Sequence, residues 1–249
     1  MDVESVPGEP EPQGRPAAPP RWGLGEAAAG LFLGYFLASI LAGIWLGATG
    51  QDELSLAGQG FSQLGLWAGL LGAPIYASRR KGSGLAADFG YQFRPIDAAL
   101  GVGIGLGVQF VVVPVVAFVL GPLLGHPDVS QPARELTQDA TGIRLVLLVG
   151  AVVVATPIIE ELYFRGLLLR AVDRRWGRAA AVVASSVVFG LVHVGQPNVR
   201  ALALAMISLT VFAVILAVVT LRTGRLGPAI VAHAVFNAWT LLVVLSINP

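Results

Sequence analysis

Long apolar stretches separated by short polar connections make up most of the chain. An α-helix needs about 20 residues to cross the hydrocarbon core of a bilayer, and several stretches reach or approach that length. The short segments of alternating polarity that build outer-membrane barrels are absent from the pattern. It therefore predicts an all-α fold, a polytopic transmembrane helical bundle with about seven spans. The spans are expected at roughly 27–49, 61–78, 96–120, 143–172, 179–195, 201–221 and 228–247.

Residues 1–22 differ in character from these spans. Proline and acidic residues crowd the segment, apolar residues are scarce, and no period is visible. Such a composition cannot bury enough apolar surface to fold, so we expect a disordered N-terminal tail at 1–22. The segment also lacks the short basic start and short apolar core of a signal peptide.

Composition supports the membrane assignment. Hydrophobic residues make up 55% of the chain, charged residues make up 12%, and the mean hydropathy is +0.74. Soluble domains usually carry about 25% charged residues, so an ordinary soluble protein is excluded. The net charge is +1 without a long basic run, so no nucleic-acid partner is expected. The chain has no cysteine, which excludes disulfides and thiol catalysis.

The basic residues around the spans indicate an orientation, because cytoplasmic loops of membrane proteins carry an excess of Lys and Arg. Most of them follow or end the second, fourth and sixth spans, namely Arg79, Arg80, Lys81, Arg94, Arg170, Arg174, Arg175, Arg178, Arg222 and Arg225. We therefore expect a multi-pass integral membrane protein with a cytoplasmic N-terminus and an exterior C-terminus. The preference for Arg over Lys indicates a GC-rich genome, and we expect a bacterial plasma membrane as the location.

A glycine-rich segment, GVGIGLG at 101–107, lies inside the third span. It is similar to a nucleotide-binding glycine run, but no strand precedes it and no acidic residue follows at the right distance. Glycines four residues apart on a membrane helix let two helix backbones approach closely. We therefore predict that this segment mediates helix packing and binds no phosphate.

Polar side chains interrupt three of the predicted spans. Ionisable groups are costly in hydrocarbon, so each is a candidate functional residue. The fourth span holds Glu160, Glu161 and Arg165, the fifth holds His193, and the seventh holds His233 and Asn237.

Helical spacing sorts these side chains into faces. Glu161 and Arg165 are four residues apart with the acid first, which is the favourable order for an ion pair. Glu160 lies about 100° around the helix from Glu161, so its carboxylate is free to point into a cavity. His233 and Asn237 are four residues apart and share one face.

Depth in the membrane gives an independent check. Glu160 precedes Arg174 by 14 residues, which is about 21 Å of helix. His193 follows Arg178 by 15 residues, which is about 22 Å. Helices that enter from the same surface therefore bring Glu160 and His193 to nearly one depth. With the shared face of the seventh span, the sequence predicts an active-site cavity inside the bundle, between the cytoplasmic surface and the midplane.

Such a cluster supports hydrolysis by an activated water. A Glu and a His can share a water and remove its proton, and a His with an Asn can donate hydrogen bonds to a developing oxyanion. Two His and a Glu could equally hold zinc with one position open for water, although the HExxH motif is absent. Proton relays in transporters use similar residues, and polar side chains also join membrane helices without any catalytic role.

Three motifs together carry a resemblance to a known family. EExxxR (Glu160, Glu161, Arg165), FxxxH (Phe189, His193) and HxxxN (His233, Asn237) occur in this order on successive apolar spans. The chain resembles the CPBP family over about 143–240. This family contains the CAAX proteases and bacteriocin-processing intramembrane endopeptidases, including the type II prenyl-protein endopeptidases.

The resemblance implies an intramembrane endopeptidase that cuts a membrane-associated protein or peptide, in CAAX-type processing of substrates that can carry a lipid. It implies that Glu160 and His193 activate the water, that His233 and Asn237 stabilise the oxyanion, and that Glu161 and Arg165 order the site. The domains are then the tail at 1–22, N-terminal transmembrane helices at 23–142 and a catalytic helical core at 143–249.

The resemblance leaves the metal open, because the family is often classed among the metalloproteases. We favour no metal, since Asn is a poor zinc ligand and a good oxyanion donor. The alternative is zinc bound by Glu160, His193 and His233. A non-catalytic membrane scaffold or bacteriocin-immunity protein on the same fold is the alternative function. A transporter is third, because no inverted repeat is visible.

Overall fold

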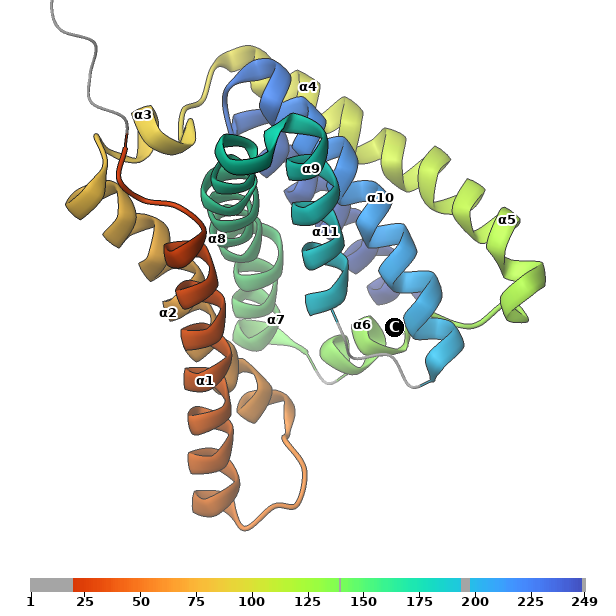
Figure 1. The fold of residues 1–249 in the computed structure, drawn as a ribbon. Helices are drawn as coiled ribbons and strands as arrows, with labels where there is room; N and C mark the ends of the chain where they lie inside the picture. Colours follow the sequence, from red (N-terminus) through yellow and green to blue (C-terminus); the bar gives the residue numbers. More distant parts are fainter. Residues whose placement is uncertain (1–19, 139, 194–197, 248–249) are drawn as a thin grey trace, which may run out of the picture.

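The computed structural model describes residues 20–138, 140–193 and 198–247, which form helices joined by short turns (Figure 1). Helices α1 (Leu24–Thr49) and α2 (Leu56–Lys81) form an N-terminal hairpin. The later elements are α3 (Leu85–Phe89), α4 (Pro95–Gly107), the π-helix η1 (Val108–Val112), α5 (Val113–Leu124), α6 (Gln131–Thr137), α7 (Gly142–Val149), the π-helix η2 (Gly150–Ala155), α8 (Thr156–Glu161), the π-helix η3 (Leu162–Leu168), α9 (Leu169–Val192), α10 (Val199–Thr223) and α11 (Gly227–Ile247).

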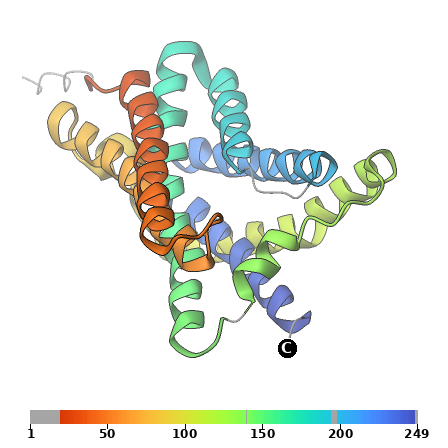
Figure 2. The same cartoon turned by 90° about the horizontal axis from the view of Figure 1, so that it is seen from below.

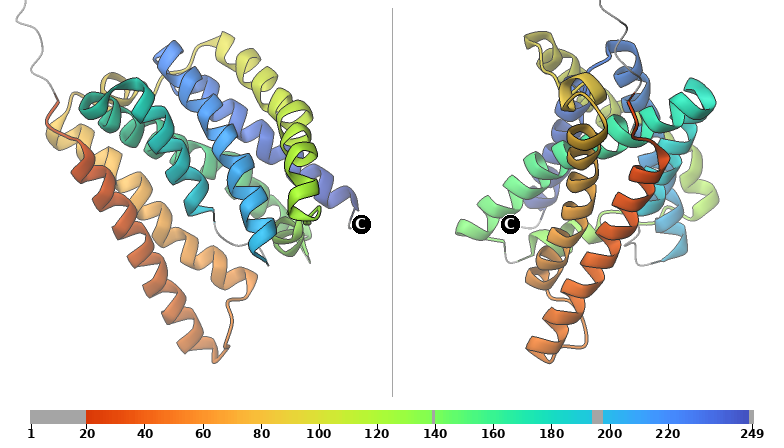
Figure 3. Two further views of the ribbon diagram at one scale, coloured as in Figure 1. Left: turned by 45° about the vertical axis from the view of Figure 1, so that its right-hand side comes forward. Right: turned by 60° about the vertical axis from the view of Figure 1, so that its left-hand side comes forward.

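The fold is a helical membrane bundle, as the sequence predicts. Within the described ranges, five helical stretches are long and apolar enough to cross a membrane. They are Leu24–Thr49, Pro95–Leu124, Gly142–Val192, Val199–Thr223 and Gly227–Ile247. Helix α2 contains the expected span 61–78 and is as long as α1. It is not apolar enough to be counted among these five stretches. In Figures 2 and 3 the α1–α2 hairpin lies at one side of the bundle and α5 at the other.

A sharp bend at Gly177 divides the stretch Gly142–Val192 into two arms. Gly177 has φ 81° and ψ 171°, a backbone conformation that favours glycine. The chain turns back on itself here, so the second arm of α9 descends beside the first (Figures 1 and 3). This arm holds most of the span expected at 179–195. The number of membrane-crossing segments in the described ranges is therefore close to the predicted number of about seven. The bend also returns the end of α9 to the level of α8.

The predicted disordered tail lies outside the described residues as far as residue 19. Residues 20–22, which the sequence assigns to the tail, are described, and Trp22 is part of the folded structure. Trp22 is 4% exposed, and its ring centroid lies 4.7 Å from that of Phe89. The guanidinium carbon of Arg174 lies 3.6 Å from the Trp22 ring centroid. Burial of this large side chain fixes the chain just before α1 begins.

The basic residues gather at one end of the bundle. The end of α2, the bend in α9 and the turn between α10 and α11 all lie at the same end in Figure 1. Hydrogen bonds join these turns: Arg170 Nη2 donates to the Gly224 carbonyl at 3.0 Å, and Leu226 N–H donates to the Gly90 carbonyl at 2.8 Å. This arrangement agrees with the predicted basic cytoplasmic side, and the assignment of that end to the cytoplasm stays a prediction.

The glycine segment of the third span packs α4 against α11. A Cβ on Gly101 would lie 2.4 Å from Val231 Cβ, and one on Gly105 would lie 2.7 Å from the Ala232 carbonyl oxygen. Gly103 on the opposite face has nothing within 4 Å of such a Cβ. The two glycines four residues apart therefore allow the close backbone approach that the sequence predicts. They also hold the helix that carries His233.

Enlarging Gly105 should destabilise the bundle, whereas enlarging Gly103 should not. We expect Gly105→Leu to lower the free energy of unfolding by about 1–3 kcal/mol, because the side chain must displace α11. The measurement is the thermal midpoint Tm of each purified variant in the same detergent. Gly103→Leu is the matched control, because it adds the same side chain to the same helix in open space. Equal Tm values for the two variants would contradict the packing role.

Candidate active site

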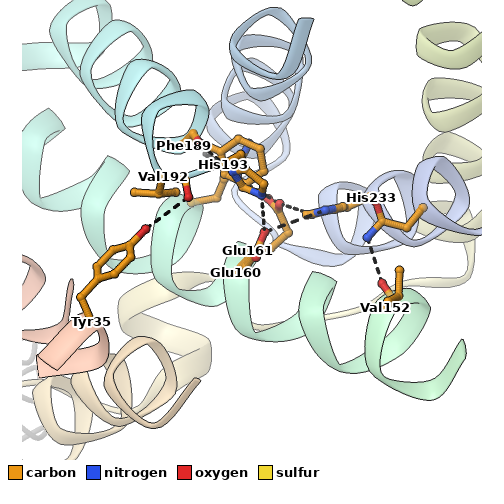
Figure 4. A network of polar contacts seen from close by, with 10 residues as sticks. Tyr35, Val152, Glu160, Glu161, Phe189, Val192, His193 and His233 are labelled. Carbon is orange, nitrogen blue, oxygen red and sulfur yellow. Dashed lines mark hydrogen bonds and ion pairs between the residues drawn. The ribbon is translucent and has the colours of Figure 1, made fainter. Parts of the chain in front are cut away.

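Four polar side chains from three separate helical segments meet inside the bundle (Figure 4). Glu160 and Glu161 end α8, and His193 follows the last residue of α9. His233 lies in the second turn of α11, in the part that Gly101 and Gly105 hold. The structure thus brings together Glu160, His193 and His233, as helical spacing and depth predict, and adds Glu161 to this cluster.

Glu161 is the centre of this cluster. Its Oε1 lies 3.0 Å from Arg165 Nη1 and 2.8 Å from His233 Nδ1. Glu161 and Arg165 are 0% and 1% exposed. The ion pair between residues four apart is the predicted one, while the contact with His233 is not evident from the sequence. The Arg165 guanidinium also stacks on the ring of Phe189, with its carbon 4.3 Å from the centroid.

The Nδ1 contacts define the hydrogen-bonding state of both histidines. His193 Nδ1 lies 2.6 Å from the carbonyl oxygen of Phe189, which can only accept, so Nδ1 carries the proton. His233 Nδ1 faces the Glu161 carboxylate and donates to it in the same way. The Nε2 atom of each ring is then the one that faces Glu160. Such contacts fix ring orientation and tautomer in many histidine sites.

Glu160 lies between the two Nε2 atoms. Its Oε2 is 3.7 Å from His193 Nε2 and 4.0 Å from His233 Nε2, and it has no hydrogen-bond partner within the described part of the chain. These separations exceed a direct hydrogen bond but suit groups that share one small hydroxylic molecule. The carboxylate is buried, so the polar atoms converge in a low-dielectric setting.

Arg165 is the basic side chain that pairs with the cluster, and a buried charge is tolerated only when it is paired. His233 lies near both carboxylates, with Nδ1 2.8 Å from Glu161 Oε1 and Nε2 4.0 Å from Glu160 Oε2.

The donor atoms do not fit a zinc ion in this arrangement. Zinc–ligand bonds of about 2.0–2.1 Å in a tetrahedral site place neighbouring ligand atoms about 3.3 Å apart. The Glu160 oxygen lies 3.7 and 4.0 Å from the two imidazole nitrogens. Among the described residues no group of three or more His and acidic side chains is close enough to hold a metal. The side chains would have to close in before a metal could bind.

Asn237 has a partner outside the cluster. Its amide Nδ2 donates to the Val152 carbonyl of η2 at 2.9 Å, which is the one hydrogen bond that it makes within the described ranges. The side chain also borders a small, mostly apolar cavity of about 90 Å³. The cavity is lined by Ala133, Leu136, Leu148, Val152, Phe236, Asn237, Thr240 and Leu241. The structure thus gives the Asn237 amide a hydrogen bond to the backbone of η2 rather than to Glu160, His193 or His233.

Tyr35 of α1 is a neighbour of the site that the sequence does not reveal. Its hydroxyl donates to the Val192 carbonyl at 3.2 Å, next to His193 (Figure 4). Helix α1 is held in place by Tyr163, whose hydroxyl donates to the Ala27 carbonyl at 2.5 Å. The first spans contain no motif, so only the packing of α1 against η3 and α9 could identify Tyr35.

This site and this fold define a helical membrane protein with a buried polar cluster. Residues 142–239 match the family model described as type II CAAX prenyl endopeptidase Rce1-like. The match supports membership of the CAAX protease and CPBP family through this segment, in agreement with the resemblance indicated by the three motifs. Searches of curated proteins and of solved structures found no match.

Proposed function

We propose that this protein is an intramembrane endopeptidase that hydrolyses a peptide bond of a membrane-associated protein or peptide, in CAAX-type processing. The observation that carries the proposal is the buried convergence of Glu160 Oε2 with the Nε2 atoms of His193 and His233. The family match over 142–239 supports the same class of reaction. The protein is an integral membrane protein, so its substrate reaches the site at or within the bilayer.

The proposed reaction uses a water held between Glu160 and His193. Removal of its proton by this pair produces a nucleophile, which attacks the carbonyl carbon of the scissile peptide bond. Protonated His233 donates from Nε2 to the developing oxyanion. The carbon–nitrogen bond of the intermediate then breaks, and the proton taken from the water passes to the leaving amine. General acid–base catalysis of this kind typically contributes about 10²–10⁴-fold to the rate.

Glu161 and Arg165 act through His233 in this proposal. Glu161 holds the Nδ1 proton of His233 and so directs Nε2 towards Glu160. Arg165 compensates the charge of Glu161. The two residues therefore order the site without contacting the substrate.

We propose that the reaction needs no metal, with zinc at Glu160, His193 and His233 as the competing arrangement. Dialysis of the purified protein against a strong chelator should leave cleavage of a fluorogenic farnesylated peptide with a CAAX end unchanged. The spacing of the three donor atoms is the physical reason. Elemental analysis of the same sample measures bound zinc directly. Stoichiometric zinc that is lost together with activity, and restored with it, would overturn the metal-free reaction.

A further inference from the structure

The helix that carries the two glutamates contains a defect three residues before Glu160. In η2, the N–H of Thr156 donates to the Ala151 carbonyl five residues back. The next donor in that register would be residue 157, and its acceptor would be the Val152 carbonyl. Residue 157 is a proline and has no N–H, so the helix itself leaves the Val152 carbonyl without this partner.

Asn237 supplies the missing donor from another helix. Its amide Nδ2 lies 2.9 Å from the Val152 carbonyl oxygen, across the contact between α11 and η2. An unpaired backbone carbonyl in a membrane interior is unfavourable, and neighbouring helices commonly satisfy the groups that a proline frees. The bond therefore replaces the hydrogen bond that Pro157 cannot make.

The position of this bond ties three parts of the site together. Asn237 follows His233 by one turn of α11, and Val152 precedes Glu160 by about two turns of the opposing segment. One bond therefore sets how α11 lies along the segment that ends in Glu160 and Glu161. The distances from Glu160 and Glu161 to His233 depend on that alignment.

We propose that Asn237 is a positioning residue, which aligns His233 with Glu160 and Glu161 by bonding the Val152 carbonyl that Pro157 leaves free. The proposal rests on the proposed function for its kinetic consequence, but the bond itself can be tested without activity. It differs from the role of oxyanion donor, in which the amide contacts the substrate and Pro157 has no part.

A double-mutant cycle between Asn237 and Pro157 separates the two roles. In the wild-type background, Asn237→Ala should lower the folding equilibrium constant by about 10- to 100-fold, because a buried carbonyl loses its partner. In the Pro157→Ala background, the restored N–H offers the helix an internal donor, so the same substitution should change the constant by less than about threefold. Thermal and denaturant unfolding of the four variants in one detergent measures both effects. An equal loss in both backgrounds would overturn the proposal.

The kinetic arm uses the same four variants and the farnesylated CAAX peptide. Misalignment of the site should lower kcat of Asn237→Ala by about 10- to 100-fold with KM changed less than about twofold. The loss should remain beside Pro157→Ala, which restores a partner for the Val152 carbonyl but not the bond between the helices. An Asn237→Ala variant that keeps wild-type kcat would overturn the positioning role. Thr240→Val is the matched control, because Thr240 lies on the same helix, lines the same cavity and bonds only to Phe236 of its own helix within the described residues.

The two proposals fail in different ways. If wild-type protein and Glu160→Gln cleave the peptide equally poorly, the proposed function fails, whereas the unfolding cycle still decides the role of Asn237. If Glu160→Gln is inactive but the cycle shows no coupling, only the positioning role fails.

Discussion

Replacing Glu160 by glutamine should remove most peptide hydrolysis while the protein remains folded. We expect kcat to fall by about 10²–10⁴-fold, because glutamine cannot accept the proton of the attacking water. The fold should tolerate the change, since Glu160 Oε2 makes no hydrogen bond within the described part of the chain. An amide can also donate to the His193 Nε2 atom, and it removes a buried charge.

Matched measurements distinguish loss of chemistry from loss of fold. Initial rates with the farnesylated CAAX peptide give kcat and KM, and Tm in the same detergent reports folding. Glu53→Gln is the control, because Glu53 is an exposed carboxylate in the turn between α1 and α2. A Glu160→Gln variant that retains wild-type kcat would exclude Glu160 as the base and with it the proposed reaction.

Much of this site follows from helical periodicity alone. The spacing of four residues predicts the Glu161–Arg165 pair, and the turn of about 100° separates Glu160 from that pair. Both predictions concern residues of one helical segment, where the separation in sequence determines the angle between two side chains around the axis. The depth comparison between Glu160 and His193 succeeds for a similar reason, because rise per residue is nearly constant along helices that start from a common surface.

Contacts between helices could not be predicted in the same way. The bond from His233 to Glu161 depends on how α11 lies against α8, and Tyr35 reaches Val192 only because α1 packs beside α9. A sequence without a motif in α1 gives no sign of such a contact. The predicted neighbours His233 and Asn237 share a face, yet the structure gives them different partners.

The π-helices explain why the partner of Asn237 is not evident from the sequence. The π-helices η2 and η3 lie on either side of α8, which ends in Glu160 and Glu161, and a π-helix changes which backbone groups bond to each other. Pro157 is the visible signal of the irregularity, since proline in a membrane helix frees backbone carbonyls that neighbouring groups must bond. A search for a polar side chain that could donate to a carbonyl freed by Pro157 would have suggested Asn237.

Removing the charge of Arg165 should have the largest effect on stability. Arg165→Met leaves two buried carboxylates, Glu160 and Glu161, without an arginine, and breaking a buried pair costs about 3–5 kcal/mol. At about 2–4 °C for each kcal/mol, Tm should fall by about 6–20 °C. Arg134→Met is the control. Arg134 pairs with Asp128 at the surface, where such a pair contributes about 0–1 kcal/mol.

The contact of Glu161 with His233 predicts which second substitutions restore stability. Glu161→Gln with Arg165→Met should recover most of the lost Tm, because the glutamine oxygen can still accept from His233 Nδ1 and no charge is left unpaired. Reversal of the pair, Glu161→Arg with Arg165→Glu, should recover little, since an arginine at position 161 cannot accept that hydrogen bond. If Glu161 served only to neutralise Arg165, reversal would restore Tm at least as well as the neutral double variant. A reversed variant with wild-type Tm would therefore show that the bond to His233 contributes nothing to the fold.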